Sequence, residues 1–175
     1  TSTLQQAASQ KMGFAAERTM RIAQSLYEGV DLGGTDPAGL ITYMRTDSFS
    51  IAKTAAVECA AFIKQSFGSA YAPQEPPTYQ TKARGAQEAH EAIRPTSVLR
   101  TPDAVRKFLN PDQIRLYDLI WKRFVASQMI EMGVGLPDSA SLSTWDRTPT
   151  AADLSARMHE WGPLMAQVSS GSFQT

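Results

Sequence analysis

The sequence predicts a mostly α-helical fold with a few short strands. Apolar residues recur at intervals of three and four along several segments, as expected for helices that bury one face. Glycines follow three of these segments, at Gly13, Gly29 and Gly68, where helices commonly end. Further along, the pairs 101–102 and 110–111 each combine a cap residue with a proline at the first helical position.

Two helices are predicted at the start of the chain. The first begins with a cap at Ser2 or Thr3 and ends at Gly13, and the second runs from about residue 15 to residue 28. The apolar faces comprise Leu4, Ala7, Ala8 and Met12 in the first helix and Ala16, Met20, Ala23, Leu26 and Tyr27 in the second. The two helices are compatible with a helix-turn-helix motif, although an ordinary αα-hairpin is the commoner pattern.

A short apolar run at residues 40–45 predicts a strand with an unusual face. Because residues two apart on a strand point to the same side, Tyr43 and Arg45 are expected to project together, opposite Thr42 and Met44. A phenol beside a permanent cation, at the mouth of a following helix, suits chemistry on a phosphate.

The helix that follows this strand is predicted to serve packing. Asp47 or Ser48 is expected to cap it, and Gly68 is expected to end it. Its apolar face consists of Ile51, Ala55, Cys59, Phe62, Ile63 and Phe67.

A long connection over residues 69–100 leads to a helix that we expect to be central to the core. This helix starts at Asn110 and Pro111, has Gln113 at the capping-box position, and runs to about residue 129. Its wide apolar stripe comprises Ile114, Tyr117, Ile120, Trp121, Phe124 and Val125.

The last part of the chain differs in composition from the rest. Residues 131–175 are rich in Ser, Thr, Gly and Pro, and only residues 150–158 suggest a helix. We therefore predict a helical domain at 1–130 and a tail at 131–175 that is either irregular or the start of a neighbouring domain.

Composition restricts the class of protein. The 17 basic and 17 acidic side chains cancel, which argues against an autonomous, high-affinity DNA-binding domain. A single cysteine, Cys59, cannot form a disulfide framework and favours a reducing cytoplasm. The sequence has no run of 18 apolar residues that would span a membrane. Since it also lacks an initiator methionine, we expect a piece of a longer protein.

Four segments together resemble the type IA DNA topoisomerases. Residues 39–48, GLITYMRTDS, resemble the active-site segment, and residues 86–96, AQEAHEAIRPT, resemble a second motif that contains a histidine. Residues 1–29 and 111–129 resemble the segments before and after, in the same order and approximate spacing, so the resemblance covers roughly 1–130.

The residue after the tyrosine distinguishes branches of this family. The topoisomerase III branch usually has proline there, whereas Met44 favours the bacterial topoisomerase I branch, with reverse gyrase as an alternative. The resemblance implies the helical, tyrosine-bearing domain of the type IA fold.

The resemblance also implies roles for two residues, and the chemistry suggests one for a third. Tyr43 would attack a phosphodiester of one DNA strand and retain the 5′ phosphate as a phosphotyrosine, and His90 would assist cleavage or rejoining. Because a free phenol has a pKa of about 10, its anion costs roughly 4 kcal/mol to form at neutral pH. Arg45 is suited to stabilise that anion or to hold a phosphate oxygen, although a surface ion pair with Asp47 is the alternative. The phosphotyrosine conserves the bond energy, so no ATP is required.

Five basic residues are candidate contacts to the DNA backbone. They are Arg94, Arg84, Lys82, Arg18 and Arg21. For Arg84 and Lys82, a solvated basic loop is an equally good interpretation.

The family also uses a carboxylate cluster that binds Mg²⁺ on a Toprim domain. No such acidic motif is present, since Asp31 and Asp36 are typical turn residues, and His90 with Glu91 lacks further ligands at zinc-like spacing. The sequence therefore predicts no metal ligands within this chain.

We expect a part of an ATP-independent, nucleoid-associated cytoplasmic enzyme that relaxes negative supercoils by transient cleavage of one strand, strand passage and religation. Its partners would be single-stranded or negatively supercoiled DNA and the missing Toprim and arch domains, without which the chain is expected to be inactive. The alternatives are a non-catalytic helical DNA-binding module that retains a relic motif, and a purely structural helical domain.

Overall fold

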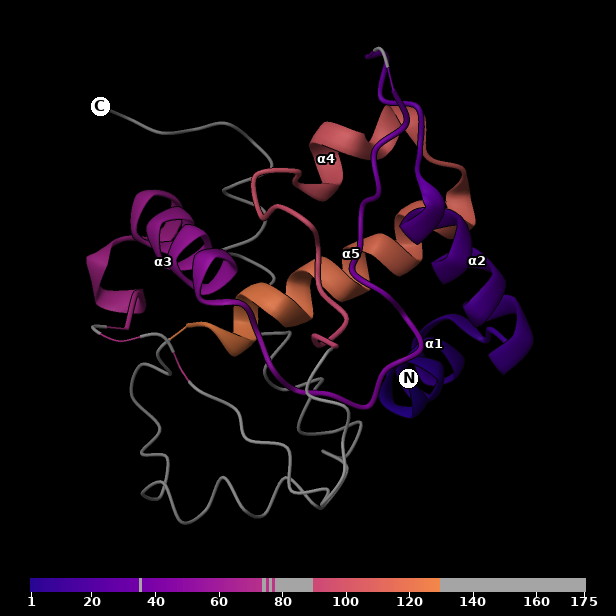
Figure 1. The fold of residues 1–175 in the computed structure, drawn as a ribbon, viewed down its shortest axis with the longest axis horizontal. Coiled ribbons are helices and arrows are strands. Elements are labelled where there is room, and N and C mark those ends of the chain that lie inside the picture. The colour runs from indigo at the N-terminus through magenta and orange to yellow at the C-terminus, as the bar shows by residue number, and fades with distance from the viewer. Residues whose placement is uncertain (35, 74, 76, 78–89, 130–175) are drawn as a thin grey trace. The chain divides into compact units, whose positions relative to one another are not determined.

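The longest helix of the described chain, α5 (Pro111–Ser127), lies at the centre of the helical unit (Figure 1). The computed structural model describes residues 1–34, 36–73, 75, 77 and 90–129. The side-chain oxygen of Asn110 accepts hydrogen bonds from the backbone N–H groups of Asp112 and Gln113, and Gln113 accepts one from the N–H of Asn110. This capping box and the burial of all six residues of the predicted stripe confirm the prediction for this helix.

The first two helices, α1 (Ser2–Met12) and α2 (Ala16–Glu28), pack on each other and on α5. Gly13 ends α1 in the left-handed conformation, as predicted. Two inward positions of α2 were wrong, because Ala16 and Tyr27 are exposed. Thr19 is buried instead, and its hydroxyl donates to the carbonyl of Ala15, which satisfies the polar group inside the core.

The third helix, α3 (Lys53–Phe67), begins later than predicted, with Ala52 as its N-cap and no side-chain cap. The expected cap at Asp47 or Ser48 is wrong. Ser48 N–H donates to the hydroxyl of Thr46, and Ser50 N–H donates to that of Ser48. Such local side-chain bonds offer the backbone an alternative to helix, so the segment stays non-helical up to the N-cap.

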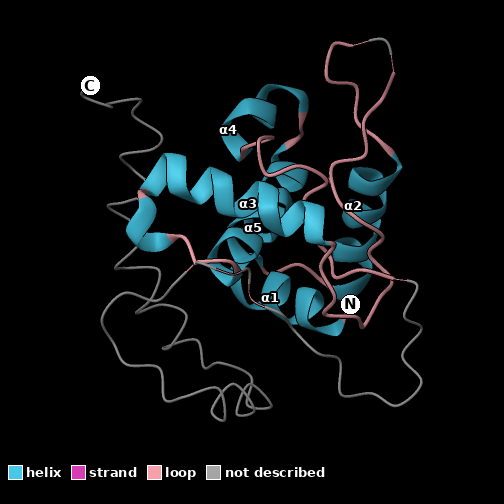
Figure 2. Cartoon of the chain, turned by 60° about the vertical axis from the view of Figure 1, so that its left-hand side comes forward, coloured by secondary structure: helices cyan, strands magenta, loops and turns pink. Residues whose placement is uncertain are grey.

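The apolar face of α3 packs toward α5, and Figure 2 shows the two helices near each other. Ala55, Cys59 and Ile63 are buried, and the ring of Phe62 meets that of Trp121 edge-on with centroids 5.6 Å apart. Burial, with a smaller contribution from the charge of Glu58, raises the pKa of the Cys59 thiol to about 12. The thiol is therefore protonated at neutral pH and serves packing.

Three short helices complete the described elements: η1 (Ser69–Tyr71) follows α3, and α4 (Pro102–Val105), which packs on α5, is followed by η2 (Arg106–Phe108). Two side chains of α5 hold the segment that precedes α4. The indole N–H of Trp121 donates to the carbonyl of Val98 at 2.9 Å, and the hydroxyl of Tyr117 donates to that of Arg100 at 2.6 Å. Residues 98–100 are thereby fixed to the central helix.

Strand structure in the described residues is limited to two isolated antiparallel bridges, Val30 with Ala38 and Ile41 with Pro95. The second bridge is flanked by hydrogen bonds from Thr42 N–H to the Arg94 carbonyl and from Thr96 N–H to the Leu40 carbonyl. The predicted strand at 40–45 is therefore only a short pairing of 40–42 with 94–96. Pro95 has no N–H to donate, which fits its place between the hydrogen-bonded positions.

Nowhere in the described ranges is a helix both long and apolar enough to cross a membrane. Residues 131–175, including the helix expected at 150–158, lie outside the described residues, so the division at 130 stays a prediction.

Gly39 lies so close to the backbone of α2 that a side chain at this position would clash with it. A Cβ at Gly39 would lie 2.8 Å from the Tyr27 carbonyl oxygen, whereas a Cβ at Gly34 would meet nothing within 4 Å. We expect Gly39→Ala to lower the free energy of unfolding by about 1–3 kcal/mol through overpacking. Gly34→Ala should leave it unchanged or raise it by up to about 1 kcal/mol. Urea unfolding followed by circular dichroism measures both, and equal stability of the two variants would contradict the prediction.

Candidate active site

Three aromatic rings from separate segments meet on the surface around Tyr43. The Tyr43 ring lies 5.5 Å from the Tyr27 ring at 68° and 5.5 Å from the His90 ring at 35°, measured between centroids. Tyr43 is 36 % exposed and Tyr27 is 40 % exposed. Within the described residues the Tyr43 hydroxyl has no hydrogen-bond partner. The Tyr43 ring thus contacts one ring from α2 and one from the segment that carries His90.

The residues next to Tyr43 alternate between solvent and core. Tyr43 and Arg45 are exposed, while Met44 is fully buried and Thr46 nearly so. The hydroxyl of Thr1 accepts a hydrogen bond from the Thr46 N–H at 3.0 Å, which fastens this segment to the start of α1. The alternation expected of a strand is therefore present, although regular strand pairing ends at Thr42.

The segment that carries His90 (residues 90–96, the His90 segment) is attached through Thr42 to the segment that carries Tyr43 (residues 40–46, the Tyr43 segment). The Thr42 hydroxyl donates to the Ala92 carbonyl at 2.6 Å and accepts from the Arg94 N–H at 3.0 Å. On its other side, the Ala92 N–H donates to the Ser50 carbonyl at 2.8 Å. These bonds bring together two motifs that lie about 50 residues apart in the sequence.

Arg94, a predicted DNA contact, is buried and donates hydrogen bonds within the protein. It is 8 % exposed, its Nε donates to Glu91 at 2.6 Å, and its Nη1 donates to the Pro95 carbonyl at 2.9 Å. The same Glu91 oxygen also accepts from the Ala52 N–H, which begins α3. The Arg94–Glu91 pair therefore links the His90 segment to the start of α3.

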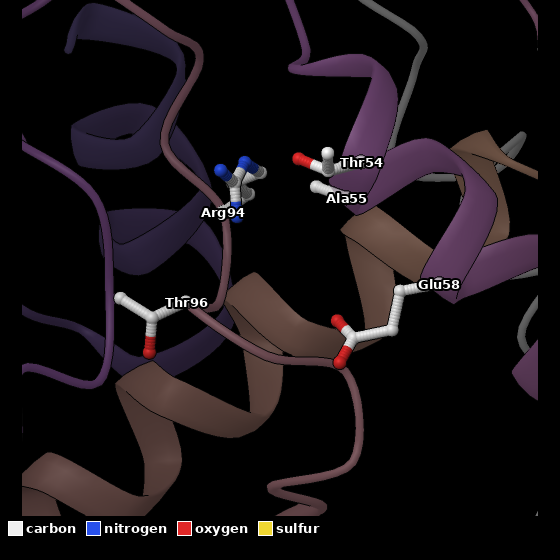
Figure 3. Close-up of a pocket in the computed structure, with 5 residues that line it drawn as sticks. All are labelled: Thr54, Ala55, Glu58, Arg94 and Thr96. Atoms are coloured by element: carbon white, nitrogen blue, oxygen red, sulfur yellow. The ribbon is translucent and has the colours of Figure 1, made fainter.

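Beside Arg94 lies a pocket of about 290 Å³, in which Arg94 and Thr54 face each other (Figure 3). Ala55, Glu58 and Thr96 complete its lining. Glu58 is also used internally, since its carboxylate accepts from the Ser97 hydroxyl at 2.8 Å and the Val98 N–H at 3.2 Å. Both charged groups of the pocket thus join neighbouring segments to each other.

Two further predicted DNA contacts, Arg18 and Arg21, form ion pairs on the surface. Arg18 pairs with Asp112 at 2.6 Å, and Arg21 pairs with Glu17 at 3.3 Å. Both side chains are exposed, and such surface pairs contribute little to stability, so either arginine can exchange its partner for a phosphate. Arg84 and Lys82 lie outside the described residues.

In the described part of the chain, no three His, Cys, Asp or Glu side chains gather so that they could hold a metal ion.

Tyr27 is the residue of this cluster that the sequence did not reveal as part of the site. It stands at the edge of the α2 apolar stripe and in the last turn before Gly29, where the helix no longer covers it. An amphipathic tyrosine at such an edge is a weak signal, because the same pattern describes a tyrosine that packs in the core with its hydroxyl at the surface.

Comparisons with known proteins identify the family of the chain. A family model described as DNA topoisomerase matches residues 1–135, which include Tyr43 and His90. "DNA topoisomerase 1" of Xylella fastidiosa strain Temecula1 is 55 % identical over 130 residues, covering 74 % of this chain and 16 % of the relative. "DNA topoisomerase 1" of Rickettsia conorii is 51 % identical over 129 residues, with the same coverage of 74 % and 16 %.

A solved structure gives the same relationship in three dimensions. Full-length topoisomerase I from Thermotoga maritima is 48 % identical, with a TM-score of 0.61 over 74 % of this chain and 19 % of that chain. The chain thus spans only 16 % of the length of the curated relatives. By sequence and by fold, the chain belongs to the type IA DNA topoisomerase family, in its bacterial topoisomerase I branch.

Proposed function

We propose that Tyr43 is the nucleophile that cleaves one DNA strand in the parent topoisomerase. The observation that supports this most directly is the Tyr43 side chain, which is 36 % exposed, has no hydrogen-bond partner for its hydroxyl among the described residues, and has its ring beside that of His90. A structural tyrosine normally satisfies its hydroxyl inside the protein, as Tyr117 does with the Arg100 carbonyl.

The proposed step is a transfer between two esters. The Tyr43 oxygen forms a bond to phosphorus, the bond from phosphorus to the 3′ oxygen breaks, and the phenolic proton leaves as the 3′ oxygen gains one. Rejoining is the reverse, and the number of phosphoester bonds does not change, so no ATP is consumed. Arg45 would hold a non-bridging phosphate oxygen, and His90 would assist proton movement at the reacting oxygens.

The rest of the site would come from the parent protein. The family resemblance implies Mg²⁺ on a Toprim domain, which would neutralise phosphate charge, together with an arch domain that encloses the passing strand. The DNA partner would be single-stranded or negatively supercoiled, and the location would be the nucleoid of the cytoplasm. In this chain, Tyr43, Arg45 and His90 would supply the nucleophile and its immediate neighbours.

Covalent capture tests the nucleophile directly. The chain is mixed with a fragment that contains the family's Toprim domain, Mg²⁺ and a single-stranded oligonucleotide labelled at its 3′ end, because the 5′-phosphate fragment is the one retained. We expect a labelled adduct that resists denaturation and disappears in Tyr43→Phe, since phenylalanine keeps the ring and lacks the attacking oxygen. Tyr27→Phe should still form the adduct. DNA binding without an adduct would instead support the non-catalytic module.

Arg45 should speed adduct formation through its guanidinium, which can donate two hydrogen bonds to phosphate oxygens. We expect Arg45→Ala to slow adduct formation by about 100-fold, in line with the removal of one group that stabilises transition-state charge. Arg45→Lys should recover only part of the rate, because an ammonium keeps the charge without bidentate geometry. Arg106→Ala, which removes an exposed arginine paired with Asp103, serves as the charge control. If Arg106→Ala slowed adduct formation as much as Arg45→Ala, the loss of positive charge alone would explain the slower rate, and the specific role of Arg45 would be contradicted.

The chain by itself should not relax DNA. A plasmid relaxation assay with Mg²⁺ and the 175-residue chain is expected to leave negative supercoils intact, because the family resemblance assigns the carboxylates that would bind Mg²⁺ to a Toprim domain. Tyr43→Phe provides the background measurement. Turnover above that background would show that the chain completes the reaction without a Toprim domain.

A further inference from the structure

We propose that Thr42 is a positioning residue, whose hydroxyl sets the placement of His90 against Tyr43. The consequence for cleavage rests on the proposed function, whereas the consequence for the two rings does not. Thr42 directly precedes Tyr43, and Ala92, which it binds, lies two residues after His90. Only a few backbone torsions therefore separate this contact from either ring.

The Thr42 hydroxyl both donates and accepts a hydrogen bond. It donates to the Ala92 carbonyl at 2.6 Å and accepts from the Arg94 N–H at 3.0 Å. A hydroxyl combines one donor with acceptor lone pairs, and a methyl group of the same size has neither. Loss of the hydroxyl would leave a backbone donor and a backbone acceptor of the His90 segment without this partner.

This hydroxyl is not needed for the pairing of the two segments. Backbone bonds already join Thr42 N–H to the Arg94 carbonyl at 2.9 Å and Thr96 N–H to the Leu40 carbonyl at 3.0 Å. Those bonds end at Arg94, while the Thr42 side chain reaches two residues further, to Ala92. What the side chain adds is therefore control over the residues that lead back to His90.

Other hydrogen bonds attach the opposite side of the His90 segment to residues at the start of α3. The Ala92 N–H donates to the Ser50 carbonyl, and Glu91 binds both the Ala52 N–H and Arg94 Nε. These bonds tie the segment to the start of α3, and Thr42 alone among these partners belongs to the Tyr43 segment. Thr42 thus determines how the two halves of the candidate site face each other.

Thr96 provides a matched control in the same pairing. Its hydroxyl donates to the Gly39 carbonyl at 2.7 Å and accepts from Arg100 Nη1 at 2.9 Å, so it also bridges two segments. It lies on the far side of the Ile41–Pro95 bridge from His90. A loss of hydrogen bonds there should affect stability without moving the rings.

The test compares Thr42→Val, Thr42→Ser and Thr96→Val in the 175-residue chain. Nuclear Overhauser contacts and ring-current shifts between Tyr43 and His90 report the ring placement by NMR without DNA. We expect Thr42→Val to lose these signals and Thr42→Ser and Thr96→Val to retain them. In the covalent-capture assay, Thr42→Val should slow adduct formation by about 10–100-fold, as misplacement of reacting groups does. Its affinity for the oligonucleotide should change less than about 3-fold, as expected of a group that contacts no DNA.

Unchanged rings and rate in Thr42→Val, or equal effects of Thr96→Val, would overturn the proposal. If Thr42→Val does not fold, Thr42→Cys replaces it, because a thiol of similar size is only a weak donor and should give intermediate signals. If the unsubstituted chain forms no adduct, the proposed function fails, while the NMR comparison still decides whether Thr42 places the rings.

Discussion

The pairing of residues 40–42 with 94–96 is the constraint on which the candidate site depends. It joins two segments about 50 residues apart, and the whole of α3 lies in the loop that it closes. Closing such a loop costs conformational entropy, which packing elsewhere must offset. Trp121 and Tyr117 supply part of that support, because their hydrogen bonds to Val98 and Arg100 fix the chain just after the pairing.

The elements that the sequence predicted well carry their own local signals. Asn110, Pro111 and Gln113 define the start of α5 within a few residues, and the stripe behind them is wide enough to identify the central helix. The start of α3 was missed for an equally local reason. Ser48 resembles a helix cap, but its hydroxyl receives the N–H of Ser50 in a turn, and only the folded structure distinguishes these two uses.

The sequence predicted only those features of the site that depend on residues close together in the chain. The spacing of Tyr43 and Arg45 predicted that the two side chains project to the same side of the chain, and both are exposed. The contact between the Tyr43 and His90 rings depends on a long-range pairing that no local pattern encodes. Arg94 stays a predicted phosphate contact, and its burial and its bond to Glu91, which no local pattern indicated, give it a structural role as well.

If Tyr43 is the nucleophile, as we propose, placing it and activating it are separate tasks, and the described residues bear on the first. The Tyr43 ring is held between Tyr27 and His90, which limits its orientations before any DNA binds. Buried titratable groups do not help activation, since burial raises the pKa of Cys59 to about 12 and also raises that of Tyr117. Under the proposed function, an oxygen that has no described partner would suit a site completed by another part of the protein, because its proton would then leave only when DNA and that part are both in place.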